Sequence, residues 1–216
     1  MNQDEIIKMT EDYVKKELEK ESSGHDWWHT DRVRNMAKSI AKKEGGNLFI
    51  IELASLLHDI GDWKLVVGDE SVGPNMAKGW LKKLKVKNNI IDEVSDIIAN
   101  VSFKGANYKN KMKTIEGKIV QDADRLDAIG AIGIARVFAF RGHHGGQMHD
   151  PDIKPKVNKT VEEYKRMDNT AINHFYEKLL LLKDRMNTET AKKIAEERHE
   201  FMEEFLKEFF KEWKVK

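Results

Sequence analysis

Cysteine is absent from this 216-residue sequence. Its absence excludes disulfide bonds, thiolate metal sites and a cysteine nucleophile. Proline is scarce, with three residues in the whole chain, and strand-like alternation of apolar and polar residues is nearly missing. Charged residues make up 35% of the chain, and many stand at spacings that pair along a helix. The composition therefore predicts an all-α fold.

The sequence also lacks a long apolar run and an excess of one charge. No run approaches the roughly 20 residues that a membrane helix needs, and the polar N-terminus has no apolar segment typical of a signal peptide. With 38 basic and 37 acidic side chains, the formal net charge is +1, which argues against nucleic acid as a general partner. We therefore expect a cytoplasmic protein with no membrane and no nucleic-acid partner.

One apolar run ends in His58 and Asp59, and Gly61 follows at once. Neighbouring residues on a helix point about 100° apart, so they do not normally share a target. Both can reach one ion if the helix ends there, and Gly61 stands where a left-handed C-terminal cap would end it. The pair is therefore either a metal-binding helix end or, alternatively, a histidine that neutralises the helix dipole beside an exposed aspartate.

Two further predicted helices carry potential metal ligands. Asp26 is the expected cap of one, and His29 lies on its inward stripe, four residues before Val33. The other is expected to run from about Thr114 to Arg141 and to be central and buried, because its apolar residues spread nearly all round. Its middle carries four charged residues, Asp122, Asp124, Arg125 and Asp127. Buried carboxylates require partners, and a cation is the simplest one.

These elements, in this order, resemble the HD-domain superfamily of metal-dependent phosphohydrolases. The resemblance covers roughly Ser22 to Phe140. It rests on three segments: His29-Thr30-Asp31-Arg32-Val33, Leu57-His58-Asp59-Ile60-Gly61-Asp62 and Asp122-Ala123-Asp124-Arg125-Leu126-Asp127-Ala128. It implies an all-helical core in which one divalent metal is held by four residues, His29, His58, Asp59 and Asp124. In the family the last ligand is the aspartate of an alanine-aspartate step, which selects Asp124; Asp122 and Asp127 stay open as alternatives.

Two imidazoles and two carboxylates suit Mn²⁺, Fe²⁺, Co²⁺, Ni²⁺ or Mg²⁺, and a six-fold geometry leaves two positions open for water and a phosphoryl oxygen. The resemblance makes Asp62 the candidate general acid or base, with pairing to Lys64 as the alternative. Arg32, three residues after His29, could bind phosphate, or it could instead pair with a nearby aspartate. Candidate substrate contacts, for each of which plain solvent exposure is the alternative, are Lys64, Lys104, His143 and His144.

No repeat, low-complexity tract or linker demands a second domain, so we expect a single HD-type domain over residues 1–216. Its metal-binding core spans about 22–140 and its C-terminal helical extension about 158–216. The extension is expected to contain two long helices, one with an apolar face from Val161 to Leu182 and one from Ala191 to Trp213. The aromatic residues of the extension suggest a homodimer as one option.

The resemblance implies a metal-dependent phosphohydrolase of small nucleotides, in which metal-bound water attacks phosphorus. The subgroup it most resembles favours a nucleoside triphosphate pyrophosphohydrolase. The alternatives are a nucleoside 5′-monophosphate phosphatase or phosphodiesterase of the same superfamily, and a non-catalytic nucleotide-sensing module. A separate hypothesis comes from His25 and His29, whose spacing is similar to that of H-E-x-x-H zinc proteases, although aspartate replaces the glutamate that those enzymes need.

Overall fold

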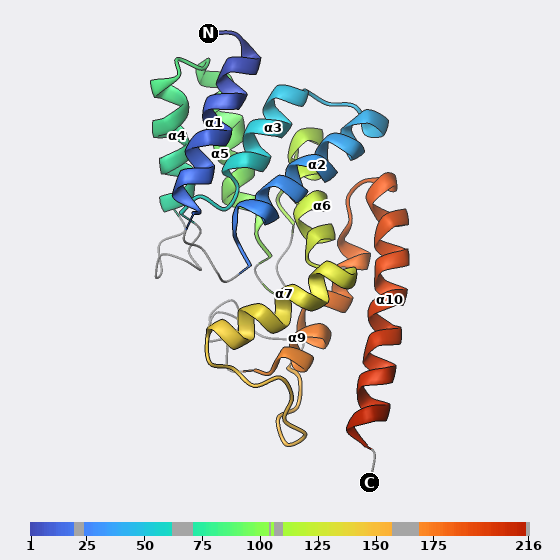
Figure 1. Ribbon diagram of the computed structural model, residues 1–216. Helices are drawn as coiled ribbons and strands as arrows, with labels where there is room; N and C mark the ends of the chain where they lie inside the picture. Colours follow the sequence, from blue (N-terminus) through green and yellow to red (C-terminus); the bar gives the residue numbers. More distant parts are fainter. Residues whose placement is uncertain (20–23, 62–70, 104, 106–109, 157–168, 215–216) are drawn as a thin grey trace. The chain divides into compact units, whose positions relative to one another are not determined.

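The structure, a computed structural model, describes residues 1–19, 24–61, 71–103, 105, 110–156 and 169–214. All regular structure in these residues is helical, as the composition predicted (Figure 1). The helices are α1 (Gln3–Glu17), α2 (Trp27–Glu44), α3 (Leu48–Leu57), α4 (Val72–Lys83), α5 (Asn88–Val101), α6 (Ile115–Asp127), α7 (Gly130–His143), α9 (Ala171–Glu177) and α10 (Glu189–Trp213), with short 3₁₀ turns η1 (Leu179–Leu181) and η2 (Lys183–Arg185). None of the described helices is long and apolar enough to cross a membrane.

Contacts within the chain define two compact units. The first contains residues 1–102 and 110–124, and the second contains residues 103–109 and 125–216. The single domain over residues 1–216 stays a prediction.

The core of the first unit is built on α3. Every residue from Phe49 to Leu57 is buried, and this helix packs against α1, α2 and α5. The side chain of Asn47 accepts a hydrogen bond from the Phe49 N–H at 3.1 Å and so caps the start of the helix. The helix ends at Leu57, and Gly61 adopts the left-handed conformation with φ +63°. His58 and Asp59 therefore lie in the turn between the helix and this glycine.

The predicted single helix from about Thr114 to Arg141 is wrong, because the chain breaks between α6 and α7. Ile129 is extended, with φ −125° and ψ 165°, and Gly130 has φ +75°, a conformation that glycine adopts without strain. Burial is also not all round, since Ile132 is 45% exposed. In the sequence, the apolar residues of two successive helices form one continuous pattern, which is why a single helix was predicted. The aspartates from Asp122 to Asp127 consequently lie in the last turns of α6 rather than in the middle of a long helix.

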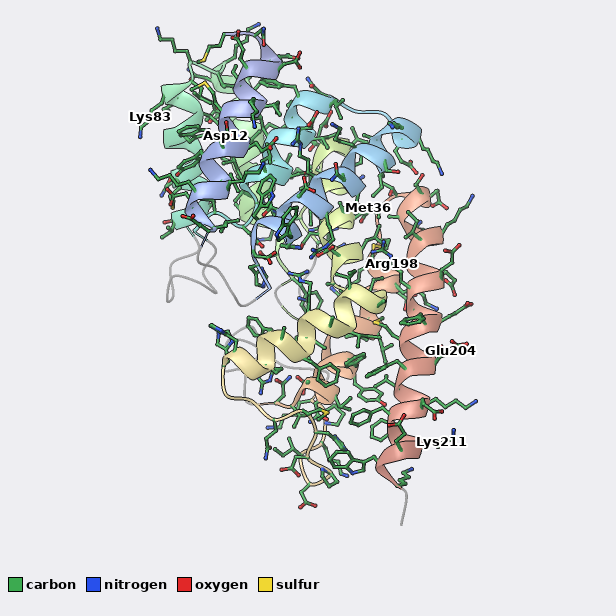
Figure 2. All side chains as sticks on the ribbon, in the orientation of Figure 1. Asp12, Met36, Lys83, Arg198, Glu204 and Lys211 are labelled. Atoms are coloured by element: carbon green, nitrogen blue, oxygen red, sulfur yellow. The ribbon has the colours of Figure 1, made fainter. Side chains whose placement is uncertain are left out.

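Glycines at this break make close contacts that a larger residue would disturb. A Cβ at Gly130 would lie 3.0–3.3 Å from the side chain of Arg198, which comes from α10 (Figure 2) and donates a hydrogen bond to the Leu126 carbonyl at 2.5 Å. A Cβ at Gly133 would lie 2.2 Å from the carbonyl oxygen of Ala128. Gly133 therefore accommodates the turn of its own chain.

Replacing Gly133 with alanine is expected to destabilise the protein by about 1–3 kcal/mol, because backbone atoms cannot move aside as a flexible side chain can. Gly142 provides the control in the same helix, since a Cβ there would meet nothing within 4 Å. Gly142→Ala should be neutral or stabilising by up to about 1 kcal/mol. Urea unfolding measures both, and an unchanged midpoint for Gly133→Ala would contradict the turn described between α6 and α7.

In the second unit α10 packs against α7, and α7 packs against α9. The fully buried ring of Phe175 stacks on Phe205 with centroids 5.7 Å apart. The predicted C-terminal helix from Ala191 to Trp213 is confirmed by α10. The long helix expected through Leu182 is wrong, because α9 ends at Glu177 and 3₁₀ turns follow; residues 157–168 lie outside the described part.

Candidate metal centre

The first side chains of the site come from the start of α2. The Asp26 carboxylate accepts a hydrogen bond from the His29 N–H at 2.9 Å, which confirms Asp26 as the helix cap. The His29 side chain is fully buried. His25 precedes the helix, so His25 and His29 do not share a helical face, and Asp26 is engaged in capping. The protease-like interpretation of this segment is therefore wrong in its helix geometry.

The next side chains come from the turn after α3. His58 Nδ1 lies 2.7 Å from the carbonyl oxygen of Ser55. Because a carbonyl oxygen only accepts, Nδ1 carries the proton, and Nε2 of the neutral ring carries a lone pair. That lone pair faces His29 Nε2 at 3.2 Å. The hydrogen bond to Ser55 thus sets His58 in the tautomer and orientation that a metal ligand needs.

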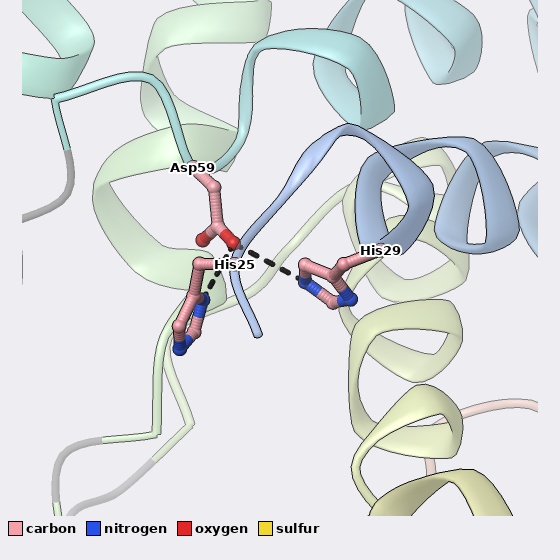
Figure 3. Close-up of side chains that lie close together, drawn as sticks. All are labelled: His25, His29 and Asp59. Atoms are coloured by element: carbon pink, nitrogen blue, oxygen red, sulfur yellow. Dashed lines mark hydrogen bonds and ion pairs between the residues drawn. The ribbon is translucent and has the colours of Figure 1, made fainter. Parts of the chain in front are cut away.

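Carboxylates from two elements face these imidazoles. Asp59 Oδ2 lies 3.2 Å from His29 Nε2 and 3.5 Å from His58 Nε2. Asp124 Oδ1, from α6, lies 3.5 Å and 3.9 Å from the same two nitrogens. Among the described residues, two groups could hold a metal ion: His29, His58 and Asp124, and His25, His29 and Asp59. The structure thus brings together all four residues that the resemblance implied, and Figure 3 shows Asp59 between His25 and His29.

These distances suit a shared divalent ion. Ligands about 2.1 Å from one ion lie about 3 Å apart at 90° and about 4.2 Å apart at 180°. The separations of 3.2–3.9 Å that join the His29 and His58 nitrogens to each other and to the Asp59 and Asp124 oxygens fall within this range. Two buried imidazole nitrogens that face each other also need a proton or a cation between them. Both the donor atoms and their spacing therefore fit a divalent metal.

The Asp59 carboxylate is held in its charged form. Burial by itself would raise its pKa, but electrostatic attraction to the His58 and His25 side chains and the hydrogen bonds from His25 and His29 outweigh burial. The pKa of Asp59 consequently lies well below its usual range. A carboxylate that stays ionised while buried is suited to binding a cation at neutral pH.

The aspartates of the α6 cluster differ in their surroundings. Asp124 is the one near the histidines, and its side chain is 26% exposed. Asp127 forms an ion pair with Arg136 of α7 at 3.0 Å. Asp122 is fully buried. This arrangement favours Asp124 over its two neighbours, and its role as a ligand stays a prediction.

For the other predicted site residues, a role in the site stays a prediction. Asp62, Lys64 and Lys104 lie outside the described residues. Arg32 lies in α2 and is half-buried, which leaves its predicted contact with phosphate untested. His143 and His144 are exposed at the end of α7 in the second unit, where His144 Nδ1 donates to the Phe140 carbonyl at 2.9 Å. Their contact with substrate likewise stays a prediction.

His149, which follows α7, packs among aromatic rings. Its ring centroid lies 4.8 Å from that of Trp213, 5.4 Å from Phe210 and 5.8 Å from Phe209. No described residue hydrogen-bonds to its buried Nδ1. Burial lowers the pKa of His149, because the charged ring loses hydration there.

The lowered pKa of His149 predicts that the second unit loses stability in mild acid. The folded state favours the neutral ring, so this contribution is complete above the unfolded pKa of about 6.5 and is lost as pH falls from there through the lower folded-state pKa. His149→Gln should flatten the fall of melting temperature between pH 7 and pH 5, although it lowers the melting temperature at pH 8. An equal fall of melting temperature between pH 7 and pH 5 in both proteins would contradict the role of His149.

Sequence reasoning missed His25 as a neighbour of Asp59. His25 Nδ1 lies 2.8 Å from Asp59 Oδ2, across 34 positions of sequence. The available signal was a histidine directly before the capping residue of the helix that carries His29. That signal does not specify the turn preceding α2, and the turn determines where His25 points.

Comparisons with known proteins establish the family of this chain. The family model of the HD domain matches residues 27–129. The uncharacterized protein YpgQ of Bacillus subtilis is 42% identical over 193 residues, which cover 88% of this chain and 85% of YpgQ. A crystal structure of an HD-superfamily hydrolase from Bacillus thuringiensis is 48% identical over 100% of both chains, with a TM-score of 0.75. The structure of YpgQ in complex with ADP has a TM-score of 0.73 at 38% identity, over 95% of this chain and 97% of that one. The chain therefore belongs to the HD-domain superfamily, as its motifs predicted.

Proposed function

We propose that this protein is a metal-dependent phosphohydrolase of small nucleotides that cleaves nucleoside triphosphates to the monophosphate and pyrophosphate. The observation that carries the proposal is the convergence of two imidazoles and two carboxylates from three separate segments. The similar protein YpgQ, crystallised with ADP, supports a nucleotide as the substrate class. The choice of triphosphate over monophosphate rests on the subgroup of the HD-domain superfamily that the sequence most resembles.

In this proposal His29, His58, Asp59 and Asp124 hold one divalent ion, with Mn²⁺, Mg²⁺, Fe²⁺, Co²⁺ and Ni²⁺ as the candidates. A bound ion supplies an acidified water and polarises a phosphoryl oxygen. The protein contributes a buried His58 ring fixed by the Ser55 carbonyl and an Asp59 carboxylate kept ionised. These groups are oriented before any ligand binds, so little reorganisation is needed when the ion and substrate arrive.

Further residues are proposed to bind or activate the substrate. Asp62 is proposed as the general acid or base, because it follows the His58–Asp59 pair closely enough in sequence to reach an attacking water. Arg32 is proposed to bind phosphate, since a guanidinium forms two parallel hydrogen bonds with it. Lys64, Lys104, His143 and His144 remain proposed substrate contacts. The cytoplasmic location expected from the sequence suits a nucleotide substrate.

The test is a screen of nucleoside mono- and triphosphates with Mn²⁺, Mg²⁺, Co²⁺ and Ni²⁺, analysed for phosphate against pyrophosphate. The proposal expects pyrophosphate and a nucleoside monophosphate from triphosphates. Release of inorganic phosphate from monophosphates would instead identify a phosphatase, and cleavage of a phosphodiester would identify a phosphodiesterase. Nucleotide binding in calorimetry without hydrolysis under any metal would identify a sensing module.

A further inference from the structure

His25 lies beside the four proposed ligands, and its Nδ1 is 2.8 Å from Asp59 Oδ2 (Figure 3). Its side chain is 14% exposed, against 4% for Asp59. Its ring is nearly perpendicular to that of His29, with centroids 5.6 Å apart. The residue that follows, Asp26, caps α2 through the His29 N–H, so one short segment carries both histidines to the site. His25 is therefore positioned at the site by the same capped helix start that positions His29.

The Asp59 Oδ2 atom faces three imidazole nitrogens, at 2.8 Å from His25, 3.2 Å from His29 and 3.5 Å from His58. His58 Nε2 carries no proton, because the proton of the neutral ring is on Nδ1. When His29 and His58 direct their Nε2 lone pairs at an ion, neither ring can donate to Asp59 from that atom. Of these three rings, His25 alone can then keep an N–H on the carboxylate.

We propose that His25 is a positioning residue, which holds the Asp59 carboxylate by an Nδ1–H hydrogen bond and so directs it toward the divalent ion. The inference rests on the proposed metal centre. A carboxylate ligand rotates freely about its Cβ–Cγ bond unless its other lone pairs are hydrogen-bonded, and such supporting partners of metal ligands typically contribute about 10–100-fold in metal affinity.

The alternative, that His25 is itself a ligand, fits the geometry less well. Five protein ligands in a six-fold geometry would leave one open position, whereas phosphoester hydrolysis needs room for both water and a phosphoryl oxygen. The separation of 2.8 Å between His25 and Asp59 is also that of a charge-assisted hydrogen bond.

The test is Mn²⁺ binding by isothermal titration calorimetry, on the full chain without nucleotide. His25→Leu removes the donor, whereas His25→Asn places an amide N–H close to where Nδ1 stands. We expect His25→Leu to weaken Mn²⁺ binding about 10–100-fold with the stoichiometry of one ion unchanged, and His25→Asn to recover most of the affinity. His25→Gln, which moves the amide toward the Nε2 position, should resemble His25→Leu and replaces it if the leucine variant does not fold.

Wild-type affinity in both His25→Leu and His25→Gln would overturn the inference. So would equal weakening in His25→Asn and His25→Leu, because that result would mean that the imidazole itself is required as a ligand. The proposed function is tested separately by the wild-type protein. If the wild type binds no Mn²⁺ the metal centre itself fails, whereas tight wild-type binding with no difference among the variants refutes only the role of His25.

Discussion

Replacement of His58 with alanine is expected to abolish both metal binding and nucleotide hydrolysis. The His58 ring is buried, its Nδ1–H is fixed on the Ser55 carbonyl, and its Nε2 faces His29 at 3.2 Å. Removing the ring deletes a proposed ligand outright, so the loss should exceed the roughly 10–100-fold that follows removal of a supporting partner. Metal content by mass spectrometry and turnover of nucleoside triphosphates measure the two effects on the same preparation.

Ser95→Ala is the control for loss of a buried polar side chain in the same unit. Its hydroxyl donates to the Ile91 carbonyl at 2.7 Å within α5, and it has no part in the proposed site. Metal content and turnover should therefore stay close to those of the wild type. Turnover that survives in a His58→Ala protein verified to be free of metal would refute the proposed function.

Substitutions of the three aspartates of α6, Asp122, Asp124 and Asp127, should identify which of them is the metal ligand. Asp124→Asn removes the charge that faces His29 and His58, and we expect a loss of metal binding comparable with that of His58→Ala. Asp127→Asn should leave metal binding intact while it lowers stability, because it breaks the ion pair with Arg136. Because Arg136 is partly exposed to solvent, we expect a loss of about 1–3 kcal/mol.

Calorimetry with Mn²⁺ measures the metal binding of each variant, and chemical unfolding measures its stability. Asp122→Asn is expected to retain the metal as well. The assignment of Asp124 would be wrong if its asparagine variant bound Mn²⁺ normally while one of the other two did not.

Local chemistry made much of the first unit predictable. Asp26 and Asn47 accept the backbone hydrogen bonds expected of caps, and Gly61 takes the left-handed conformation that its position indicated. These features depend on side chains within a few residues of the helix ends, so a sequence contains the information. The placement of His58 and Asp59 in a turn after a buried helix followed directly from them.

Other features depend on interactions that a periodic pattern does not contain. Two apolar helices in series gave one continuous pattern, and the extended Ile129 with left-handed Gly130 separates them. The second unit shows the same difficulty, since α9 has seven residues where a long amphipathic helix was expected. The contact of His25 with Asp59 joins positions 34 apart and requires the packing of α2 on α3. Tertiary contacts of this kind override local propensity.

The central claim is that four side chains from three segments bind one divalent ion. A crystal grown with Mn²⁺ and measured for anomalous scattering tests it most directly. We expect one strong anomalous peak at about 2.0–2.3 Å from His29 Nε2, His58 Nε2 and carboxylate oxygens of Asp59 and Asp124. An anomalous map with no peak among these atoms, or imidazoles of His29 and His58 turned away from each other, would contradict this claim.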